Sequence, residues 1–270
     1  MSLHLAQEET GALSTSSCCV LLEDTWEADD IKDECSRVSI TCRELSVGDI
    51  EEVNAIEFSK STFMCNTELT QRKLREAGLL NKVPSTYPNS LQNLLKRSVK
   101  QRILKTISVS DLPIFIKPVS NDKSFDGRVV QDMPGLASLR EEAGDGECLV
   151  WVAEKVCFLV EHRLFVGGGE LYGTGRIQGK GDAVPPESFV REVLACCGVD
   201  VFWAVDVGLM TPLPGTGEGG GGNRGQEEGS EEECWAVVEV NPPFALDDHG
   251  LAIEPYCRYC RDACAWLRRP

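Results

Sequence analysis

EKVCFLVEHRLFV, residues 154–166, is the stretch of sequence that decides the fold. Glu154 and Glu161 stand seven residues apart and bracket an apolar segment, and Arg163 follows two residues after Glu161. Because alternate side chains of a strand face the same side, Glu161 and Arg163 would share one face. Acids and a cation on an apolar strand indicate either an internal ion pair or a polar site.

Two later apolar segments carry acids that a buried strand would not hold without a reason. Asp206 ends VFWAVD, and Glu239 and Asn241 lie in AVVEVN, residues 236–241. Carboxylate and amide oxygens suit Mg²⁺ that also binds phosphate oxygens. Residues two apart on a strand point to one side, so Glu239 and Asn241 could serve one metal. The alternative is an ion pair of Glu239 with Arg163 or Arg176.

Lysine and arginine residues also occur in or beside apolar segments earlier in the chain. Lys117 lies in IFIKPV, where burial of an unpaired ammonium would be costly, so it requires an anionic partner unless it faces solvent. Lys123 and Arg128 follow around SFDG, and Arg176 ends YGTGR. The order is cations, a glutamate pair, a cation, then Asp and Glu-x-Asn.

With these motifs the sequence resembles the ATP-grasp superfamily of carboxylate–amine ligases, in particular its compact subgroup with one arginine and two lysines. IFIKP, EKVCFLVEHRLFV and AVVEVNPPFAL carry the resemblance, which spans roughly Ser85 to Trp266. It implies an α+β fold, the ATP-grasp fold, in which two α+β subdomains clasp ATP. It also implies Mg²⁺, activation of a carboxylate as an acyl phosphate, and attack by an amine, with small-molecule or peptide substrates.

The resemblance implies catalytic and phosphate-binding roles for four cations. Lys117 matches the strand lysine that contacts the α- and β-phosphates, and Lys123 matches the second lysine, on the loop that covers the phosphates. Arg163 matches the arginine of the subgroup's Glu-x-Arg pattern. Arg176 corresponds to the cation that faces the γ-phosphate.

It also implies how the nucleoside and the metal are held. Glu154, with Lys155 and Val156, falls at the hinge that pairs with adenine, and Glu161 matches the acid that binds the ribose hydroxyls. The implied metal ligands are Asp206, Glu239 and Asn241. There is no GxxxxGK[ST] motif, so a P-loop nucleotide site is not indicated.

Composition excludes other classes of function. The 270 residues carry 27 Lys and Arg against 43 Asp and Glu, a net charge of −16, which argues against general binding to nucleic acid or to an anionic membrane. The longest apolar run, residues 149–160, contains Glu154 and Lys155, so we expect no membrane span. The 13 cysteines have an irregular spacing that does not fit a secreted disulfide framework, so we expect a reduced, cytoplasmic protein.

The chain divides by texture into three parts. Residues 1–35 are polar and acidic and predict a disordered leader; residues 36–110 predict a small α/β unit that precedes the ATP-grasp domain; and residues 111–270 predict that domain, with a disordered Gly- and Glu-rich insert at 213–233. The stretch SLQNLLKRSVKQRILKTI, residues 90–107, predicts a basic amphipathic helix. Its cations would form a solvated face or, as the alternative, bind phosphate.

Two further hypotheses compete with the ligase. A degenerate nucleotide-binding or interaction module would keep the fold without turnover. A cysteine-based metal or redox protein would use Cys257, Cys260 and Cys264, which fall on one helical face. Apolar packing of these thiols is the simpler interpretation, because no fourth ligand accompanies them.

Overall fold

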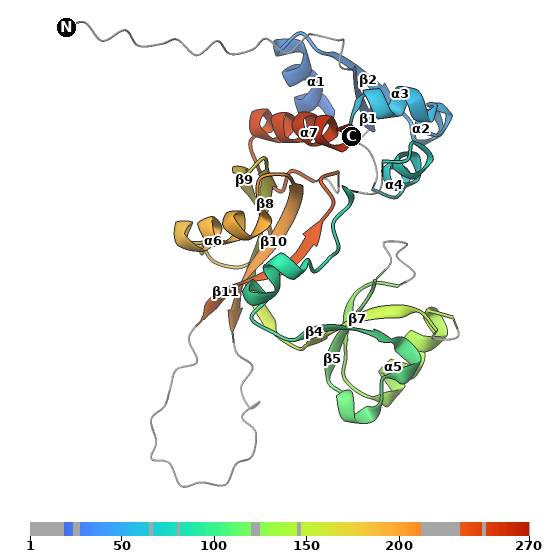
Figure 1. The fold of residues 1–270 in the computed structure, drawn as a ribbon, viewed down its shortest axis with the longest axis vertical. Coiled ribbons are helices and arrows are strands. Elements are labelled where there is room, and N and C mark those ends of the chain that lie inside the picture. Colours follow the sequence, from blue (N-terminus) through green and yellow to red (C-terminus); the bar gives the residue numbers. More distant parts are fainter. Residues whose placement is uncertain are drawn as a thin grey trace, which may run out of the picture.

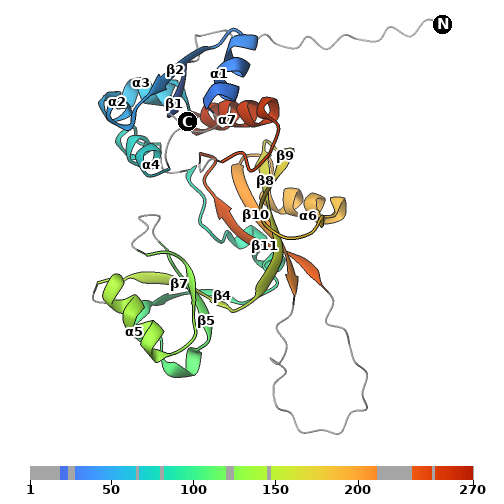
Figure 2. The ribbon, with the colours of Figure 1, turned by 180° about the vertical axis from the view of Figure 1, so that it is seen from behind.

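The computed structural model describes residues 19–23, 28–64, 67–79, 82–119, 125–144, 147–211, 233–244 and 247–269. Three sheets follow one another along the long axis of the molecule, each with its own helices (Figures 1 and 2). In the described part of the chain no helix is both long and apolar enough to cross a membrane. The predicted insert lies almost wholly outside the described residues, as does Lys123.

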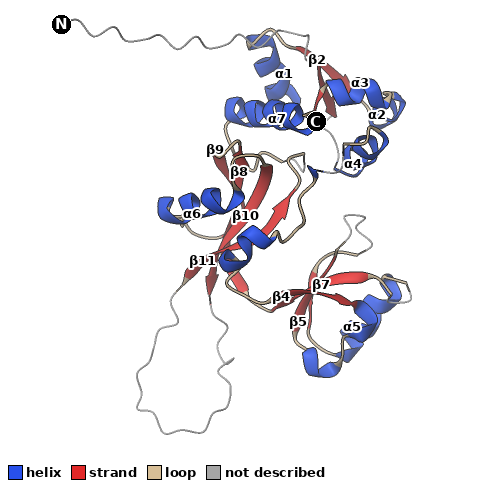
Figure 3. Ribbon diagram, viewed as in Figure 1, coloured by secondary structure: helices blue, strands red, loops and turns tan. Residues whose placement is uncertain are grey.

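The first layer is a three-stranded parallel sheet with the order β2-β1-β3, covered by helices (Figure 3). Side-chain caps start two of these helices, through Ser46 and Asn54. Its elements are β1 (Cys19–Glu23), α1 (Ala28–Arg37), β2 (Thr41–Leu45), α2 (Val47–Glu52), α3 (Ala55–Lys60), β3 (Thr62–Met64), α4 (Thr67–Glu76) and, from the other end of the chain, α7 (Ile253–Leu267).

The prediction of a disordered leader over residues 1–35 is wrong for residues 19–23 and 28–35, and its remaining residues lie outside those that the structure describes. β1 and most of α1 lie in this stretch, and Ala28, Ile31 and Cys35 of α1 are buried in the first layer's core. These three residues form a helical stripe that the surrounding acids obscure in the sequence. The core cannot be predicted from the sequence of this segment alone, because α1 packs against α7, which lies near the other end of the chain.

The middle layer is an antiparallel sheet with the order β11-β10-β8-β9. Its strands are β8 (Cys157–Gly167), β9 (Glu170–Gly179), β10 (Phe202–Thr211) and β11 (Cys234–Asn241). Helix α6 (Glu187–Cys197) starts after Pro186, ends at Gly198 and packs its apolar side on one face of this sheet, against residues such as Leu164 and Val207. The opposite face is left for polar side chains and for α7.

The third layer is an antiparallel sheet with the order β4-β7-β5-β6 and its own helix and core. Its elements are β4 (Val99–Ile103), β5 (Ile114–Pro118), β6 (Arg128–Val130), α5 (Met133–Glu142) and β7 (Leu149–Glu154). β4 precedes the predicted boundary at residue 110, and α7 returns to the first layer. The layers are therefore not consecutive blocks of sequence.

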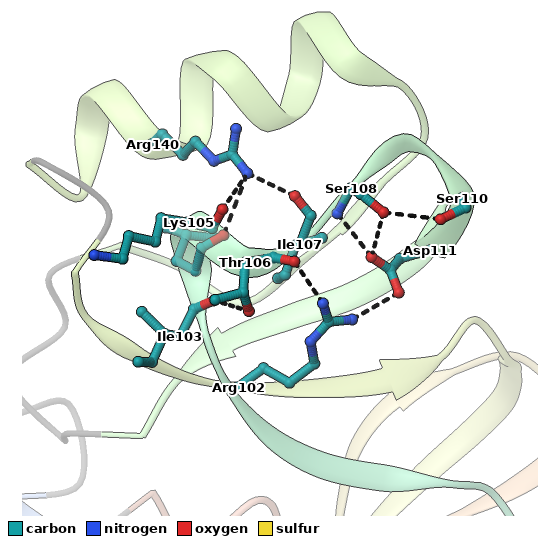
Figure 4. Close-up of polar contacts among 10 residues, drawn as sticks. Arg102, Ile103, Lys105, Thr106, Ile107, Ser108, Ser110, Asp111 and Arg140 are labelled. Carbon is teal, nitrogen blue, oxygen red and sulfur yellow. Dashed lines mark hydrogen bonds and ion pairs between the residues drawn. The ribbon is translucent and has the colours of Figure 1, made fainter.

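The predicted basic helix at residues 90–107 does not form. A 3₁₀ helix, η2 (Asn89–Leu94), ends before Lys96, whose positive φ of 52° interrupts any continuous helix, and β4 follows. Figure 4 shows what one of the cations does instead: Arg102 donates to Asp111 Oδ1 at 2.6 Å and to the Thr106 carbonyl at 2.6 Å. Arg140 of α5 donates to the Ile107 carbonyl at 2.6 Å, so this network fixes the turn after β4.

Phe165 of β8 joins the middle sheet to α7, and we expect its removal to destabilise the protein strongly. Its ring is fully buried, with centroids 5.9 Å from Tyr256 and 5.2 Å from Tyr259. Phe165→Ala should lower the free energy of unfolding by about 3–5 kcal/mol in urea titrations. Leu159→Ala on the same strand is the control, because Leu159 is 40% exposed. Equal losses in the two variants would contradict this packing.

Candidate active site

Five polar side chains gather on the face of the middle sheet opposite α6. Asp206 of β10 is the direct partner of Arg163 on one side and of Glu239 on the other. Directly opposed residues of antiparallel strands point to the same side, so these three share a face. Glu161 and Asn241 lie two residues along their strands and join them.

Asp206 is the centre of this cluster. Arg163 donates to it through two bonds, Nε to Oδ1 at 2.8 Å and Nη2 to Oδ2 at 3.0 Å, a bidentate pair. The two side chains are only 11% and 7% exposed. The Asn241 amide donates to Asp206 Oδ2 at 2.8 Å and to Glu239 Oε1 at 3.4 Å. The cluster therefore joins three neighbouring strands.

Lys117 reaches the cluster from the third sheet. Its ammonium forms an ion pair with Glu239, and both side chains keep about a quarter of their surface exposed. The anionic partner that the sequence required for Lys117 is thus present. Glu239 does form an ion pair, as the alternative interpretation held, but with Lys117 and not with Arg163 or Arg176. This contact brings β5 and β11, from two different sheets, together.

Burial disfavours the ionised form of two acids of the cluster, Asp206 and Glu161. It raises the pKa of Asp206 to about 6, against the opposing effect of the Arg163 charge. Burial also raises the pKa of Glu161, although the Gln178 amide donates to its Oε1 at 2.6 Å. A further cation close to these carboxylates, such as a metal ion, would favour their ionised form.

Arg97, which the sequence placed on a solvated helix face, instead binds the backbone of β11 next to the cluster. It donates to the carbonyls of Val237 at 2.8 Å and Val238 at 2.7 Å, next to Glu239 on β11. It also donates to the carbonyl of Leu95 at 3.0 Å. One feature of the sequence could have predicted this role. Arg97 closely follows Leu94 and Leu95, and the burial of these two leucines holds this part of the chain against the core.

The hinge residues lie where the chain passes from the third sheet to the middle one. Glu154 ends β7 with an exposed side chain, and its N–H donates to the Ser98 carbonyl at 3.3 Å. Lys155 and Val156, both half-buried, form the connection to β8. Glu161 follows on β8, five residues after Val156.

Arg176 does not join the cluster. It is the strand partner of His162, and its neighbour Gly175 is the partner of Arg163, so Arg176 points to the opposite face. Its exposed guanidinium donates to the Gly179 carbonyl at 2.9 Å. His162 is buried on that side, and its Nε2 lies 2.9 Å from the Ala183 carbonyl oxygen.

The cluster offers an incomplete set of metal ligands. The predicted ligands are two carboxylates, Asp206 and Glu239, and the Asn241 amide, and nowhere in the described ranges are three His, Cys, Asp or Glu side chains placed to hold a metal. Mg²⁺ is typically bound by one or two carboxylates together with phosphate oxygens and water, so Asp206, Glu239 and Asn241 fit it when a phosphate supplies the rest. Cys260 and Cys264 are buried in the first core, as packing predicts.

Comparison with known protein families finds one family whose pattern the chain matches. An ATP-grasp domain family, the second family of the clade named for one arginine and two lysines, matches residues 94–259. No curated protein matches the chain by sequence. The match extends from the end of η2 into α7, and the predicted fold class, the α+β ATP-grasp fold, is confirmed.

Similar solved structures are ATP-grasp proteins of low identity. The chain is similar to a D-alanine–D-alanine ligase from Bacillus anthracis, with 13% identity over 93% of this chain and 98% of that one and a TM-score of 0.49. It is also similar to a RimK domain ATP-grasp protein from Sphaerobacter thermophilus, with 13% identity, the same coverage and a TM-score of 0.47. The macrocyclase MdnC from Microcystis aeruginosa, bound to its precursor peptide, is 11% identical over 93% of this chain and 99% of that one, with a TM-score of 0.47.

We expect Arg163→Met to destabilise the protein by about 3–5 kcal/mol, because it leaves the buried Asp206 carboxylate without its cation. Arg128→Met is the matched control, since the Arg128–Glu142 pair is 42% exposed on both sides and such pairs contribute about 0–1 kcal/mol. Urea unfolding of both variants measures the difference. If the two variants were equally stable, the buried pair would not hold the cluster together.

Proposed function

The chain belongs to the ATP-grasp family, within the clade of one arginine and two lysines, and from this membership we propose that it is an ATP- and Mg²⁺-dependent ligase. It would activate a carboxylate as an acyl phosphate, release ADP and join the acyl group to an amine. The observation that carries the proposal is the ion pair by which Lys117, from the third sheet, joins the cluster around Arg163, Asp206, Glu239 and Asn241 on the middle sheet.

Transfer of a phosphoryl group needs positioning and neutralisation of charge more than covalent chemistry from the protein. The cluster provides both. Lys117 supplies a point charge from the third sheet, and Arg163 supplies a planar donor that suits oxygen pairs. Lys123, on the chain segment after β5, remains the proposed second lysine; Arg176 takes no part in the proposal, because it points to the other face.

The nucleoside would lie along the edge where β7 passes into β8. The hinge at Glu154, Lys155 and Val156 offers backbone groups for adenine, and Glu161 offers a carboxylate for the ribose hydroxyls. From Glu161 the phosphates would extend toward Lys117 and Glu239. This direction would bring the negatively charged phosphates to the positive charge of Lys117, which reaches the cluster from the third sheet.

Mg²⁺ would be held by Asp206, Glu239 and Asn241, and when bound it neutralises phosphate charge as the leaving group departs. Arg163 keeps Asp206 oriented through its two bonds, and Arg97 keeps the β11 backbone in place. Lys117 must share Glu239 with the metal or move to the phosphates when the nucleotide binds.

Two measurements decide the proposal. Calorimetry with ATP in the presence and absence of Mg²⁺ tests binding, and phosphate release over a panel of amino acids and short peptides tests turnover. Metal-dependent binding with substrate-stimulated release supports the ligase. ATP binding without any phosphate release would favour the non-catalytic nucleotide-binding module. Absence of ATP binding would contradict both the ligase and that module.

We expect Lys117→Ala to weaken ATP binding by about 10- to 100-fold, because a charge-assisted contact contributes roughly 1.5–3 kcal/mol. Calorimetry at saturating Mg²⁺ measures the change. Lys100→Ala is the control, since Lys100 lies exposed on β4 of the same sheet. A folded Lys117→Ala variant with unchanged ATP affinity would contradict the assignment.

We expect Glu239→Gln to abolish phosphate release while the protein stays folded, with excess Mg²⁺ restoring part of the activity. The exchange removes an anionic ligand but keeps the shape of the side chain. The glutamine carbonyl can still accept a hydrogen bond from Lys117, so the unfolding free energy should fall by less than in Arg163→Met. Glu142→Gln, in the exposed pair with Arg128, is the control. A strongly destabilised variant without a Mg²⁺ response would show that Glu239 acts only as a structural ion pair.

A further inference from the structure

The loop 247–251 lies directly on the charged face of the middle sheet. A Cβ atom on Gly175 would come within 2.5 Å of the Asp248 carbonyl oxygen and 2.7 Å of His249 Cβ. Gly175 is the strand partner of Arg163, so its missing side chain would point to the same side as the Arg163 guanidinium. The loop therefore occupies that side of β9, next to Arg163, and only glycine at position 175 allows the close approach.

His249 is fixed at the tip of this loop. Its backbone is left-handed, with a φ of 52°, which is uncommon outside glycine. The turn is held by Asp248, whose Oδ1 accepts from Gly250 N at 2.7 Å and whose carbonyl accepts from Leu251 N at 3.0 Å. The His249 carbonyl accepts from Arg176 N at 2.7 Å, which ties the loop to β9.

The imidazole of His249 is half-buried, and neither of its ring nitrogens has a hydrogen-bond partner among the residues that the structure describes. Burial and then the Arg163 charge lower the pKa of His249 below its ordinary value, while Asp247 and Asp248 oppose the shift. At neutral pH the ring is therefore uncharged and keeps a lone pair that can accept a proton.

The order of groups across the face suggests what this lone pair does. Glu239 on β11, Asp206 on β10, Arg163 on β8 and the His249 loop over β9 follow one another across four neighbouring strands. Resting on the proposed function, the metal and phosphates occupy the first two positions. The activated acyl group would then lie at Arg163 and the incoming amine beside His249.

We propose that His249 accepts the proton of the amine that attacks the acyl phosphate. The amine nitrogen forms a bond to the carbonyl carbon, the bond from that carbon to the phosphate oxygen breaks, and phosphate leaves with the electron pair. The proton that an incoming alkylammonium must lose before its nitrogen can attack passes to a ring nitrogen of His249, and the second proton, lost as the amide forms, leaves with the phosphate. The loop 247–251 is thus the wall of the acceptor pocket.

The variant that tests this role is His249→Asn, because asparagine also tolerates a positive φ and so preserves the turn. Glu254→Gln, an exposed position just beyond this loop at the start of α7, is the control. Each is compared on a carboxylate that stimulates ADP release in the unchanged protein. The acceptors are hydroxylamine, which is already unprotonated at neutral pH, and a primary alkylamine, which is mostly an ammonium ion there.

We expect His249→Asn to keep ADP release and hydroxamate formation with hydroxylamine within about two-fold of the unchanged protein, while ligation to the alkylamine falls by about 10²- to 10⁴-fold. Raising the pH should recover part of that ligation, because the amine then loses its proton to solvent. In the unchanged protein the rate should fall as the pH drops through the pKa of His249. Equal losses with both acceptors, or no loss with either, would overturn the role.

A second readout needs no activity. In ¹H–¹⁵N NMR titrations the chain offers only three histidines, so His249 can be assigned by its substitution. We expect it to titrate below the ordinary value and to shift upward in Arg163→Gln. Titration at the ordinary value, with no response to that substitution, would overturn the placement beside Arg163. Failure of the proposed function would look different, since no carboxylate would then elicit ADP release from the unchanged protein.

Discussion

The buried ion pair between Arg163 and Asp206 is the constraint on which the rest of the site depends. Two charges at this depth have lost most of their hydration, so each is tolerable only while it holds the other. Asp206 in turn orients Asn241, which also reaches Glu239, and Glu239 holds Lys117 from the neighbouring sheet. A chain of polar contacts thus runs from the centre of one sheet to the next and sets the position of both.

The alternation of β8 explains why this pair lies beside a hydrophobic core. Leu164 and Val166 face α6 and build one core, whereas Arg163 faces the other way. Two residues further on, Phe165 lies on the face of Arg163 and packs against α7. β8 therefore serves three purposes: it contributes apolar side chains to the core under α6, it carries Arg163 of the charged cluster, and it contacts α7 of the first layer.

The sequence predicted what depends on local pattern and missed what depends on distant partners. The strands around Lys117, Asp206 and Glu239, and the shared face of Glu161 and Arg163, follow from alternation within a few residues. The face of Arg176 does not, because it depends on the pairing register of β9. A bulge next to the hairpin makes Gly173, and not Tyr172, the partner of Phe165, so Arg176 lies opposite His162, whereas an unbroken register would place it opposite Glu161. α1 was missed for a similar reason, since its core partner α7 lies at the far end of the chain.

Net charge is a poor guide to a site of this kind. The chain carries −16 overall, yet the cluster sets Lys117, Arg163 and Arg97 against three acids, Glu161, Asp206 and Glu239, so it is close to neutral. Surface charges are screened over roughly 8 Å at physiological ionic strength, whereas partly buried charges are screened much less. A compact anion whose charge a metal partly neutralises therefore meets mainly the local field. A long polyanion, which must lie along the surface, meets the acids there, so an acidic chain can reject nucleic acid and still accommodate a nucleotide.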